Sequence, residues 1–365
     1  MKRARIAVVG AGGIGAAAHL PAIVALDEQA ELVGIVDLDE VRRTEAGERF
    51  GTDKLYSDLA VMMQEQNPDI VVLATPPHTH EPLAIQVMRA GAWVFCEKPM
   101  TGSLASVDRI HAVELETGQA CITVSQFRYS GGARQVRDKL RSGQWGSVLT
   151  GYANTSWYRG PEYWETSWRG KFATEFAGAT TTQAHHAIDL LLWLMGDWSS
   201  VAGFADTLDR PIEVEDASTA VVRFAGGGMA TLLSQVLSHQ QETRIQVTAQ
   251  KATVDLETLY MPLMDEWTVR QIDSDGQSQI VNDWSEPEGE KQAHREQLAN
   301  ILGHWRAGER PELMVSEARA TIEFLTALYK SAATGTLVKR GEIVAGDPFY
   351  EAIDAGGPAR AEGKN

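Results

Sequence analysis

The residues with the clearest chemical potential stand in a glycine-rich loop near the N-terminus. This loop, Gly10-Ala11-Gly12-Gly13-Ile14-Gly15, follows the apolar run 6–9 and precedes an alanine-rich stretch. In such a loop the first glycine permits a tight turn, the second lets the backbone approach a pyrophosphate, and the third lets a helix pack against the strand. Free N–H groups at the helix N-terminus would face the phosphates. We predict a dinucleotide site made by Gly10, Gly12, Gly13, Ile14 and Gly15.

A carboxylate that follows about two dozen residues later addresses the choice of dinucleotide. Asp37 ends a second apolar run, 32–36, where a carboxylate can accept hydrogen bonds from a ribose diol. It would repel a 2′-phosphate, and the acidic pair at 39–40 adds negative charge beside it. The pattern therefore favours NAD over NADP, while Arg42 and Arg43 leave some use of NADP open.

Three further segments carry polar side chains at positions where a ligand could be reached. The first, 74–80, includes Thr75, Pro76, His78 and His80; the second is Glu97-Lys98-Pro99, and the third is 183–189. The first two follow predicted strands, and ligands of parallel sheets bind at the carboxyl ends of strands. That position argues against an ordinary surface role for Lys98. No HExxH motif or cysteine cluster accompanies the histidines, so we expect them to shape the loop and predict no metal.

The elements that would position these segments alternate regularly up to about residue 125. Apolar runs predict strands, and helical patterns lie between them, which implies a parallel sheet covered on both faces. We therefore expect an α/β Rossmann dinucleotide-binding domain over residues 1–125. Its predicted strands are 5–9, 32–36, 70–74, 93–96 and 120–125, and its helices are 13–26, 39–50, 58–66, 81–90 and 104–118.

The pattern changes after about residue 147. One strong helix, 182–195, is followed by a series of strand candidates, which predicts an α+β domain with a large open, mostly antiparallel sheet. We assign it residues 126–345, for substrate binding and oligomerisation, and expect 346–365 to form a polar tail. The strand candidates are 199–206, 217–224, 229–237, 243–249, 252–256, 266–272 and 278–281, and the closing helices are about 291–307 and 316–333.

An aromatic-rich segment, 156–164, is expected to form a loop, because it is too polar and broken for a core strand. Aromatic faces can pack on the C–H faces of sugar rings, while charged side chains bind the hydroxyls. The candidates for substrate contact are Tyr158, Arg159, Tyr163 and Trp164. An oligomer interface rich in tryptophan and tyrosine remains an alternative.

Composition excludes several classes of function. The 33 basic and 49 acidic residues give a net charge of −16, which disfavours nucleic acid or an anionic membrane as the main partner. The sequence contains no run of eighteen apolar residues, the length that could span a membrane. The basic start resembles a signal peptide, but its apolar part breaks at Gly10. The two cysteines, Cys96 and Cys121, lie in predicted strands and are expected to be reduced core residues of a cytoplasmic protein.

Together these motifs resemble the family of glucose–fructose oxidoreductase, inositol dehydrogenase and MocA-type oxidoreductases. The resemblance covers nearly the whole chain, and its most specific motif is Glu97-Lys98-Pro99. It includes the glycine loop and the Thr75-Pro76 segment. It extends to Gln126-Phe127-Arg128, Trp168-Arg169-Gly170 and His186-x-x-Asp189.

The resemblance implies roles for particular residues. Lys98 would lie beside the nicotinamide and the substrate hydroxyl, and His186 would exchange the hydroxyl proton. A secondary alcohol must lose a proton as its hydride leaves, and imidazole titrates in the required range. A cis bond before Pro99 and a substrate contact or packing role for His185 are also implied. The cofactor site would include Thr75, Pro76, His78, His80, Glu97, Lys98, Gln126, Trp168 and Arg169.

One departure from the family pattern concerns Thr182. Many family members have an aspartate there, four residues before the histidine. Threonine can hydrogen-bond a substrate hydroxyl but cannot take its proton at neutral pH. The proton transfer would then fall to His186 and Lys98, whereas Asp189 is expected to be structural.

The sequence therefore predicts an NAD-dependent oxidoreductase that transfers hydride between the nicotinamide and a ring secondary hydroxyl of a sugar, glycoside or cyclitol. The resemblance implies a homodimer or homotetramer paired through the open sheet face. One alternative is a glycosidase that oxidises, eliminates and reduces again with retained NAD. Another is a non-enzymatic NAD-binding sensor, which the presence of Lys98 and His186 disfavours. The shape of the pocket selects the sugar and the carbon.

Overall fold

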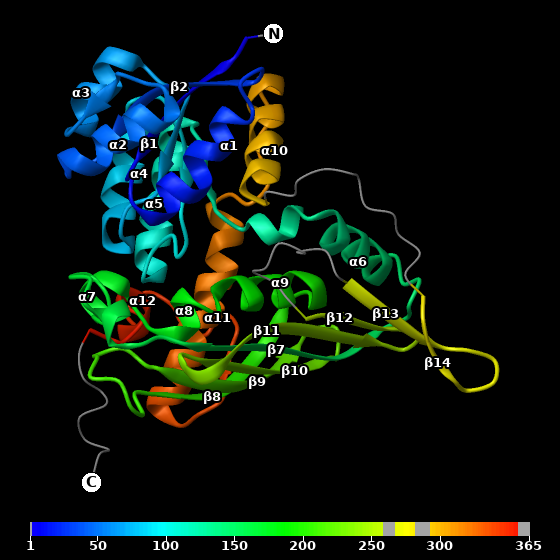
Figure 1. The fold of residues 1–365 in the computed structure, drawn as a ribbon. Helices are drawn as coiled ribbons and strands as arrows, with labels where there is room; N and C mark the ends of the chain where they lie inside the picture. Colours follow the sequence, from blue (N-terminus) through cyan, green and yellow to red (C-terminus); the bar gives the residue numbers. More distant parts are fainter. Residues whose placement is uncertain (1, 258–266, 282–292, 357–365) are drawn as a thin grey trace. The chain divides into compact units, whose positions relative to one another are not determined.

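The computed structural model describes residues 2–257, 267–281 and 293–356. Within these residues the chain forms two compact units (Figure 1). The first unit contains residues 2–101, 106–126 and 293–319. The second unit contains residues 102–105 and 127–281, as far as they are described, and 320–356.

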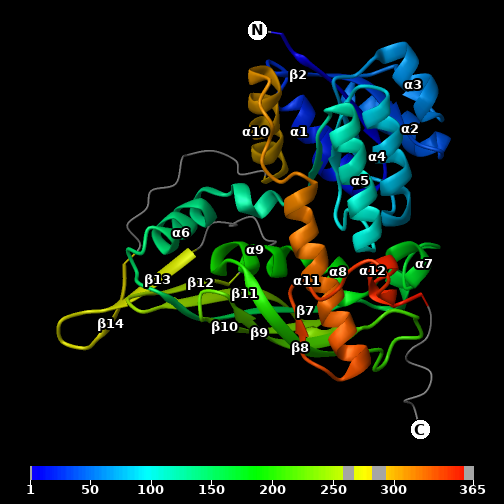
Figure 2. The same cartoon turned by 180° about the vertical axis from the view of Figure 1, so that it is seen from behind.

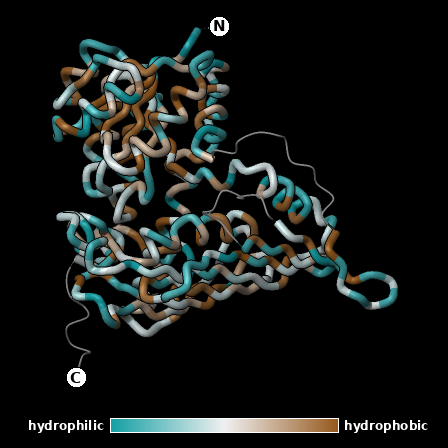
Figure 3. Tube along the Cα trace, in the orientation of Figure 1, coloured by the Kyte–Doolittle hydropathy of each residue, from teal (hydrophilic) through white to brown (hydrophobic). Residues whose placement is uncertain are grey.

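The described part of the first unit is built on a sheet of six parallel strands in the order β3-β2-β1-β4-β5-β6. The neighbours β1 and β4 lie at the point where the strand order reverses, and every residue of β4 is buried, which places the core there. Figure 3 shows this apolar centre. The strands are β1 (Ala4–Val9), β2 (Ala30–Val36), β3 (Leu55–Tyr56), β4 (Ile70–Leu73), β5 (Trp93–Cys96) and β6 (Cys121–Thr123).

Helices connect these strands, and polar contacts fix some of them to one another. Helices α4 and α5 lie side by side in both views (Figures 1 and 2), where Arg109 Nε donates to Glu81 Oε1 at 2.5 Å. The helices and helical turns are η1 (Gly15–His19), α1 (Leu20–Val24), α2 (Glu40–Phe50), α3 (Leu59–Gln66), η2 (Pro77–Thr79), α4 (His80–Arg89) and α5 (Leu104–Thr117). The α/β fold class and its Rossmann sheet are confirmed.

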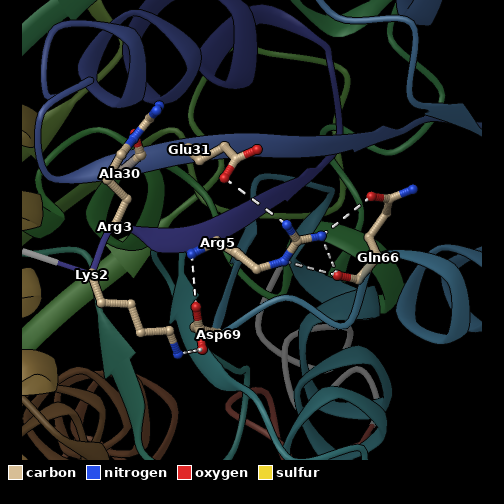
Figure 4. Close-up of polar contacts among 7 residues, drawn as sticks. All are labelled: Lys2, Arg3, Arg5, Ala30, Glu31, Gln66 and Asp69. Atoms are coloured by element: carbon tan, nitrogen blue, oxygen red, sulfur yellow. Dashed lines mark hydrogen bonds and ion pairs between the residues drawn. The ribbon is translucent and has the colours of Figure 1, made fainter.

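The N-terminal end of β1 is held by polar contacts to its neighbours (Figure 4). The backbone N–H of Arg5 donates to Asp69 Oδ2 at 2.8 Å, and the Arg5 guanidinium donates to the Gln66 carbonyl at 2.6 Å. Arg3 donates to the Ala30 carbonyl at 2.9 Å. These contacts fix β1, and therefore the loop that follows it, against β2 and the segment before β4.

The helix α10 (Ala293–Ala307) returns to the first unit from far along the chain. Gln297 joins it to β6, because its amide donates to the Thr123 carbonyl at 2.8 Å and accepts from Ser125 N at 3.0 Å. Its place in the sequence predicts that this helix belongs to the second domain, but its contacts put it in the first unit. Its apolar residues pack within the first unit instead.

The second unit is built on a sheet of nine described strands in the order β14-β13-β12-β11-β7-β10-β9-β8-β15. Its described pairs are antiparallel except for β7 with β10, so the mostly antiparallel sheet is confirmed. The strands are β7 (Val148–Tyr158), β8 (Trp198–Asp206), β9 (Ala217–Phe224), β10 (Met229–Gln235), β11 (Leu237–Ala249), β12 (Thr253–Leu256), β13 (Trp267–Ile272), β14 (Ser278–Ile280) and β15 (Val338–Lys339).

Helix α9 covers one face of this sheet over β7 and β11 (Figures 1 and 2). The approach is close, since a Cβ on Gly151 would lie 2.5 Å from Met195 Sδ. Residues of β9 and β10 alternate between buried and exposed, which leaves their other face open to solvent. The helical elements are η3 (Gln126–Tyr129), α6 (Gly131–Arg141), η4 (Pro161–Trp164), α7 (Phe172–Glu175), α8 (Ala179–Thr182), α9 (His185–Met195), α11 (Val315–Thr334) and α12 (Pro348–Glu351).

Two expectations about local structure were wrong. Residues 156–158 do not belong to a loop, because they end β7, where Trp157 Nε1 donates to Thr243 Oγ1 of β11 at 2.9 Å. Hydrogen bonds to a neighbouring strand thus satisfy polar atoms that argued against a strand. The stretch from 346 to 356 does not form a polar tail either: it contains α12, and Phe349 and Ile353 are buried. Residues 357–365 lie outside the described residues.

Candidate functional site

The glycine loop combines two tight positions with two open ones. Gly10 has φ +99°, and a Cβ there would lie 2.6 Å from the Ala74 carbonyl oxygen. A Cβ on Gly15 would lie 2.0 Å from the Gly10 carbonyl oxygen. Around Gly12 and Gly13, by contrast, no atom comes within 4 Å of such a Cβ. The loop therefore packs tightly through Gly10 and Gly15 and leaves bare backbone at Gly12 and Gly13, which fits the close approach of a pyrophosphate.

The side chain of Asp37 is held in place by the same loop. Its Oδ2 accepts from Ala11 N at 2.8 Å and its Oδ1 accepts from Asp39 N at 2.9 Å. Each carboxylate oxygen keeps a lone pair for a further donor, so the side chain can still accept from a ribose diol. The two arginines that could accommodate NADP pair with acidic residues at the start of α2, Arg42 with the N-cap Asp39 at 3.6 Å and Arg43 with Glu40 at 3.8 Å.

The buried ring of His80 contacts the backbone of the segment that follows β4. This fully buried imidazole places Nε2 2.9 Å from the Thr75 carbonyl and Nδ1 2.9 Å from the Pro99 carbonyl. Burial lowers the pKa of His80, although both carbonyls favour the protonated ring. Because its two ring nitrogens face carbonyls of two different loops, His80 lies between these loops, and its predicted cofactor contact stays a prediction. His78 is exposed on the same segment.

Glu97 precedes a cis peptide bond between Lys98 and Pro99, as the resemblance implies. Its Oε2 accepts from Lys98 N at 3.1 Å. Its Oε1 lies 2.9 Å from His19 Nε2 and 3.5 Å from His294 Nε2. The backbone N–H of the half-buried Lys98 therefore donates to a carboxylate that also lies close to two imidazole rings.

We name His19, Glu97 and His294 the Glu97 triad. Burial alone would raise the pKa of Glu97, but the hydrogen bond with His19 and the nearby imidazole of His294 hold it well below its usual range. Burial lowers the pKa of His19. Both directions describe a neutral His19 that donates to an ionised carboxylate. The three side chains could each offer one ligand atom to a metal, and these atoms lie within 4.8 Å of one another. Two imidazoles and a carboxylate are ligand types that also suit zinc. Sequence reasoning missed both histidines, since His294 lies nearly two hundred residues from Glu97.

The histidines of the second unit lie at the start of α9. His186 and His185 are both buried, and the His186 ring meets Phe127 edge to face at 5.1 Å. Thr182 does not share their helix, because α8 ends at Thr182 and α9 begins at His185. The predicted single helix 182–195 is thus two helices.

Asp189 anchors α9. Its carboxylate accepts from Arg128 Nε at 2.7 Å and from Arg128 Nη2, and Thr321 Oγ1 donates to it at 2.9 Å. Burial would raise the pKa of Asp189, but the charge and hydrogen bonds of Arg128 lower it. The expected structural role of Asp189 agrees with these contacts.

A second group of polar side chains surrounds Arg169, and we name it the Arg169 network. Arg169 Nη1 donates to Glu175 Oε1 at 3.2 Å and to the Tyr163 hydroxyl. Gln183 Nε2 donates to the same hydroxyl at 2.7 Å, and Thr182 Oγ1 donates to Glu175 Oε1 at 3.1 Å. The structure thus joins Tyr163, Arg169 and Thr182, which were predicted separately. Glu175 has no motif of its own, and sequence reasoning missed it.

The other aromatic candidates fall into two clusters. Trp164 meets Tyr163 edge to face at 4.9 Å, and the Arg159 guanidinium lies 5.2 Å from the Tyr163 ring, so both adjoin the Arg169 network. Tyr158 instead stacks on His239 at 5.3 Å. The guanidinium of Arg169 lies 4.2 Å from the Trp168 ring. Gln126 is buried in the first unit. The cofactor and substrate contacts of these residues stay predictions.

Among the residues that the structure describes, no helix has both the length and the hydropathy needed to cross a bilayer.

Two protein-family models match successive parts of the chain. Residues 4–125 match the model described as an oxidoreductase family with an NAD-binding Rossmann fold. Residues 133–255 match the GFO/IDH/MocA C-terminal domain.

Individual relatives match over almost the whole length. D-apiose dehydrogenase of Paraburkholderia graminis is 25% identical over 99% of this chain and 96% of its own. Myo-inositol 2-dehydrogenase of Thermotoga maritima is 25% identical over 93% of this chain and 99% of its own. The crystal structure of the WlbA dehydrogenase from Bordetella pertussis, in complex with NADH and UDP-GlcNAcA, superposes with a TM-score of 0.80. It is 30% identical and covers 93% of this chain and 99% of that chain.

Proposed function

Because this chain belongs to the Gfo/Idh/MocA family of NAD-binding oxidoreductases, we propose that it is an NAD-dependent dehydrogenase. It would transfer hydride between the nicotinamide and a ring secondary hydroxyl of a sugar, glycoside or cyclitol. The observation that carries the proposal is the glycine loop with Asp37. Bare backbone at Gly12 and Gly13 stands beside a carboxylate whose two oxygens are already oriented by backbone N–H groups.

The first unit would bind the cofactor and the second the substrate. When bound, NAD supplies the ring that accepts the hydride. Asp37 would accept from the adenosine ribose, and its charge would discriminate against a 2′-phosphate, which supports NAD over NADP. Arg42 and Arg43 favour the same choice, because neighbouring acids already pair with them.

Three residues would handle the reacting hydroxyl. Lys98 would polarise the carbinol oxygen, His186 would accept its proton as general base, and Thr182 would hydrogen-bond the substrate. The contacts of Lys98 support its role in particular. The ionised Glu97 carboxylate accepts a hydrogen bond from the Lys98 backbone N–H and so holds the backbone at Lys98 in place.

We further propose a homodimer or homotetramer in the cytoplasm. The open face of β9 and β10 exposes Val221, Met229 and Leu233, which supports pairing through this face. The cytoplasmic location is supported by Cys96 and Cys121, both buried free thiols in the core of the first unit.

The test is absorbance at the NADH band, with purified protein, NAD⁺ and a panel of monosaccharides, glycosides and inositols. A nucleotide-sugar acid belongs in the panel, because one matched structure contains UDP-GlcNAcA. A rise with one class of substrate would support the dehydrogenase and identify that class. Parallel wells with NADP⁺ test the cofactor choice, and a slower rise is expected there.

Glycoside cleavage without NADH accumulation would instead indicate the redox-recycling glycosidase. The relatives reported above are named dehydrogenases and give that alternative no specific support. Tight NAD binding without turnover of any panel member would point to the non-enzymatic sensor.

A further inference from the structure

The carboxylate of Glu175 is hydrogen-bonded to the hydroxyl of Thr182. Glu175 ends α7, and only 1% of the residue is exposed. Its Oε2 accepts from Gly170 N at 2.6 Å, and its Oε1 accepts from Arg169 Nη1 at 3.2 Å and from Thr182 Oγ1 at 3.1 Å. Thr182 itself is half-buried, so one side of its hydroxyl faces this buried anion while the residue still reaches solvent.

The position of α8, which carries Thr182, is fixed by a second buried carboxylate. Glu215 accepts from Gly178 N at 2.8 Å and from Thr180 N at 3.0 Å. The Tyr329 hydroxyl donates to it at 2.6 Å. These bonds hold the turn on which Thr182 stands, so the contact between Thr182 and Glu175 does not depend on a mobile side chain alone.

The chemistry of the pair fixes the direction of its hydrogen bond. An ionised carboxylate only accepts hydrogen bonds, and a threonine hydroxyl has a single hydrogen to donate. A second acceptor near Thr182 Oγ1 is the Ala177 carbonyl at 3.5 Å, which also only accepts. The hydroxyl hydrogen therefore points into the protein, and Thr182 meets a ligand through its lone pairs.

We propose that Glu175 is a positioning residue that makes Thr182 an obligatory hydrogen-bond acceptor toward the substrate. Thr182 then selects a substrate that presents a free hydroxyl at this place, and disfavours a deoxy sugar or one that carries a carbonyl or an ether there. No bond forms or breaks in this step. The inference rests on the proposed function, because only there does Thr182 contact the substrate.

The charges around Glu175 suit this role. Burial raises the pKa of Glu175, although Gly170 N, Arg169 and Thr182 oppose the rise, and the charge of Glu215 adds to it. Tyr163 is a further titratable group, and Arg169 joins it to Glu175. A carboxylate more basic than usual is a stronger acceptor for the Thr182 hydrogen. Protonation in acid would give Glu175 a hydrogen to donate, and Thr182 could then turn.

A merely structural Glu175 would serve only to neutralise Arg169. The two roles differ in their coupling to Thr182, and a double-mutant cycle measures that coupling. The variants are Glu175→Gln, which keeps the size but offers an N–H to Thr182, and Thr182→Val, which removes the hydroxyl. The matched control is Glu165→Gln, an exposed glutamate of the same segment.

We expect Glu175→Gln to lower kcat/KM for the best panel substrate by roughly 10- to 100-fold. The double variant should be no slower than Thr182→Val alone, and Thr182→Ser should keep most of the activity. Both Glu175→Gln and Thr182→Val should also lose the preference for that substrate over its deoxy analogues. Glu165→Gln should change none of these values.

Losses that multiply in the double variant would overturn the inference, as would less than a threefold effect of Glu175→Gln. NAD affinity and Tm are measured alongside, and both should stay close to wild type. If Glu175→Gln does not fold, the deoxy series with Thr182→Val and Thr182→Ser decides, since retained discrimination by Thr182→Val overturns the inference. An inactive wild type would overturn the proposed function, whereas an active wild type with an unaffected Glu175→Gln overturns this inference alone.

Discussion

At the scale of single residues, Lys98 is the side chain on which the proposed chemistry depends most. The Glu97 carboxylate accepts from the Lys98 backbone N–H, and we expect the Lys98 ammonium group to act on the substrate oxygen. Lys98→Ala should therefore lower kcat by about 10²- to 10⁴-fold while the Kd for NAD changes only a few-fold. Steady-state kinetics and a fluorescence titration with NADH measure the two quantities.

The control for this substitution is Lys54→Ala, an exposed lysine of the same unit whose ammonium pairs with Asp53 at 3.2 Å. It should leave both quantities unchanged. Turnover that survives Lys98→Ala would contradict the role assigned to Lys98.

Residues could be predicted from the sequence where their function depends on neighbours in the chain. Gly10, Gly15 and Asp37 belong to one continuous pattern, and the structure gives each the geometry that the pattern requires. Glu175 and His294 could not be found this way. Their partners lie on separate elements, and a single glutamate or histidine in a helix has no spacing that marks it.

At the scale of elements, the glycine loop and its helix separate packing from binding. Gly15→Ala should lower Tm by several degrees, because its Cβ would overlap the Gly10 carbonyl. Gly12→Ala should leave Tm near the wild-type value, since its Cβ meets no protein atom, yet raise the Kd for NAD at least about tenfold by occupying the space of the pyrophosphate. Calorimetric unfolding and NAD titration of both variants provide the comparison. Equal Tm losses in the two would argue against this division.

The Glu97 triad should make the stability of the protein depend on pH. Below about pH 6.5 the unfolded chain binds a proton at His19 that the folded protein, with its lowered His19 pKa, does not bind. Stability therefore falls as the pH decreases from about 6.5 toward 5. A further loss follows below about pH 4.5, because Glu97 then takes up a proton in the unfolded chain but stays ionised in the folded protein, where its pKa is lowered.

Urea unfolding at several pH values, in wild type and in His19→Gln, tests this dependence. At pH 7.5 the variant should lose about 1–3 kcal/mol, the range for a hydrogen bond to a buried charged group. Between pH 6.5 and 5 its stability should change less than that of the wild type. Parallel slopes would show that His19 does not carry the effect.

Elements with regular hydropathy could be predicted, and β9 was found with the expected bounds. The central strand β7 could not, because its polar residues are satisfied by β10 and β11 rather than by local partners. The helix after the glycine loop was also predicted. Its π-helical turn at Gly15–His19 was not, because no pattern of residue types indicates such a turn.

At the scale of the whole molecule, the open sheet face should decide the oligomeric state. Val221 is 57% exposed and Leu233 40% exposed on this face. Val221→Arg combined with Leu233→Arg should convert the oligomer to monomers, as light scattering after size exclusion would show. The control is Leu115→Arg, because Leu115 is as exposed but lies on α5 of the first unit. A wild type that is monomeric at micromolar concentration would contradict the proposal.

The composition and the order of strands could be used to predict two domains, but not how the chain divides between them. Residues 293–319 follow the strands of the second unit in the sequence, so their order in the chain predicts that they belong to it. Their membership of the first unit depends on contacts such as Gln297 with β6, which join residues more than 170 positions apart.

This return of α10 bears on how the protein is made. A ribosome that has produced the first 126 residues has delivered all six strands of the first sheet, yet β6 still lacks the Gln297 amide that bonds to Ser125 and Thr123. Because α10 follows the second sheet in the chain, the first unit gains these contacts only after that sheet has been synthesised. A gene cut after residue 126 would encode only 126 of the 365 residues and leave β6 without its contacts to Gln297, and we expect such an exposed strand edge to favour aggregation.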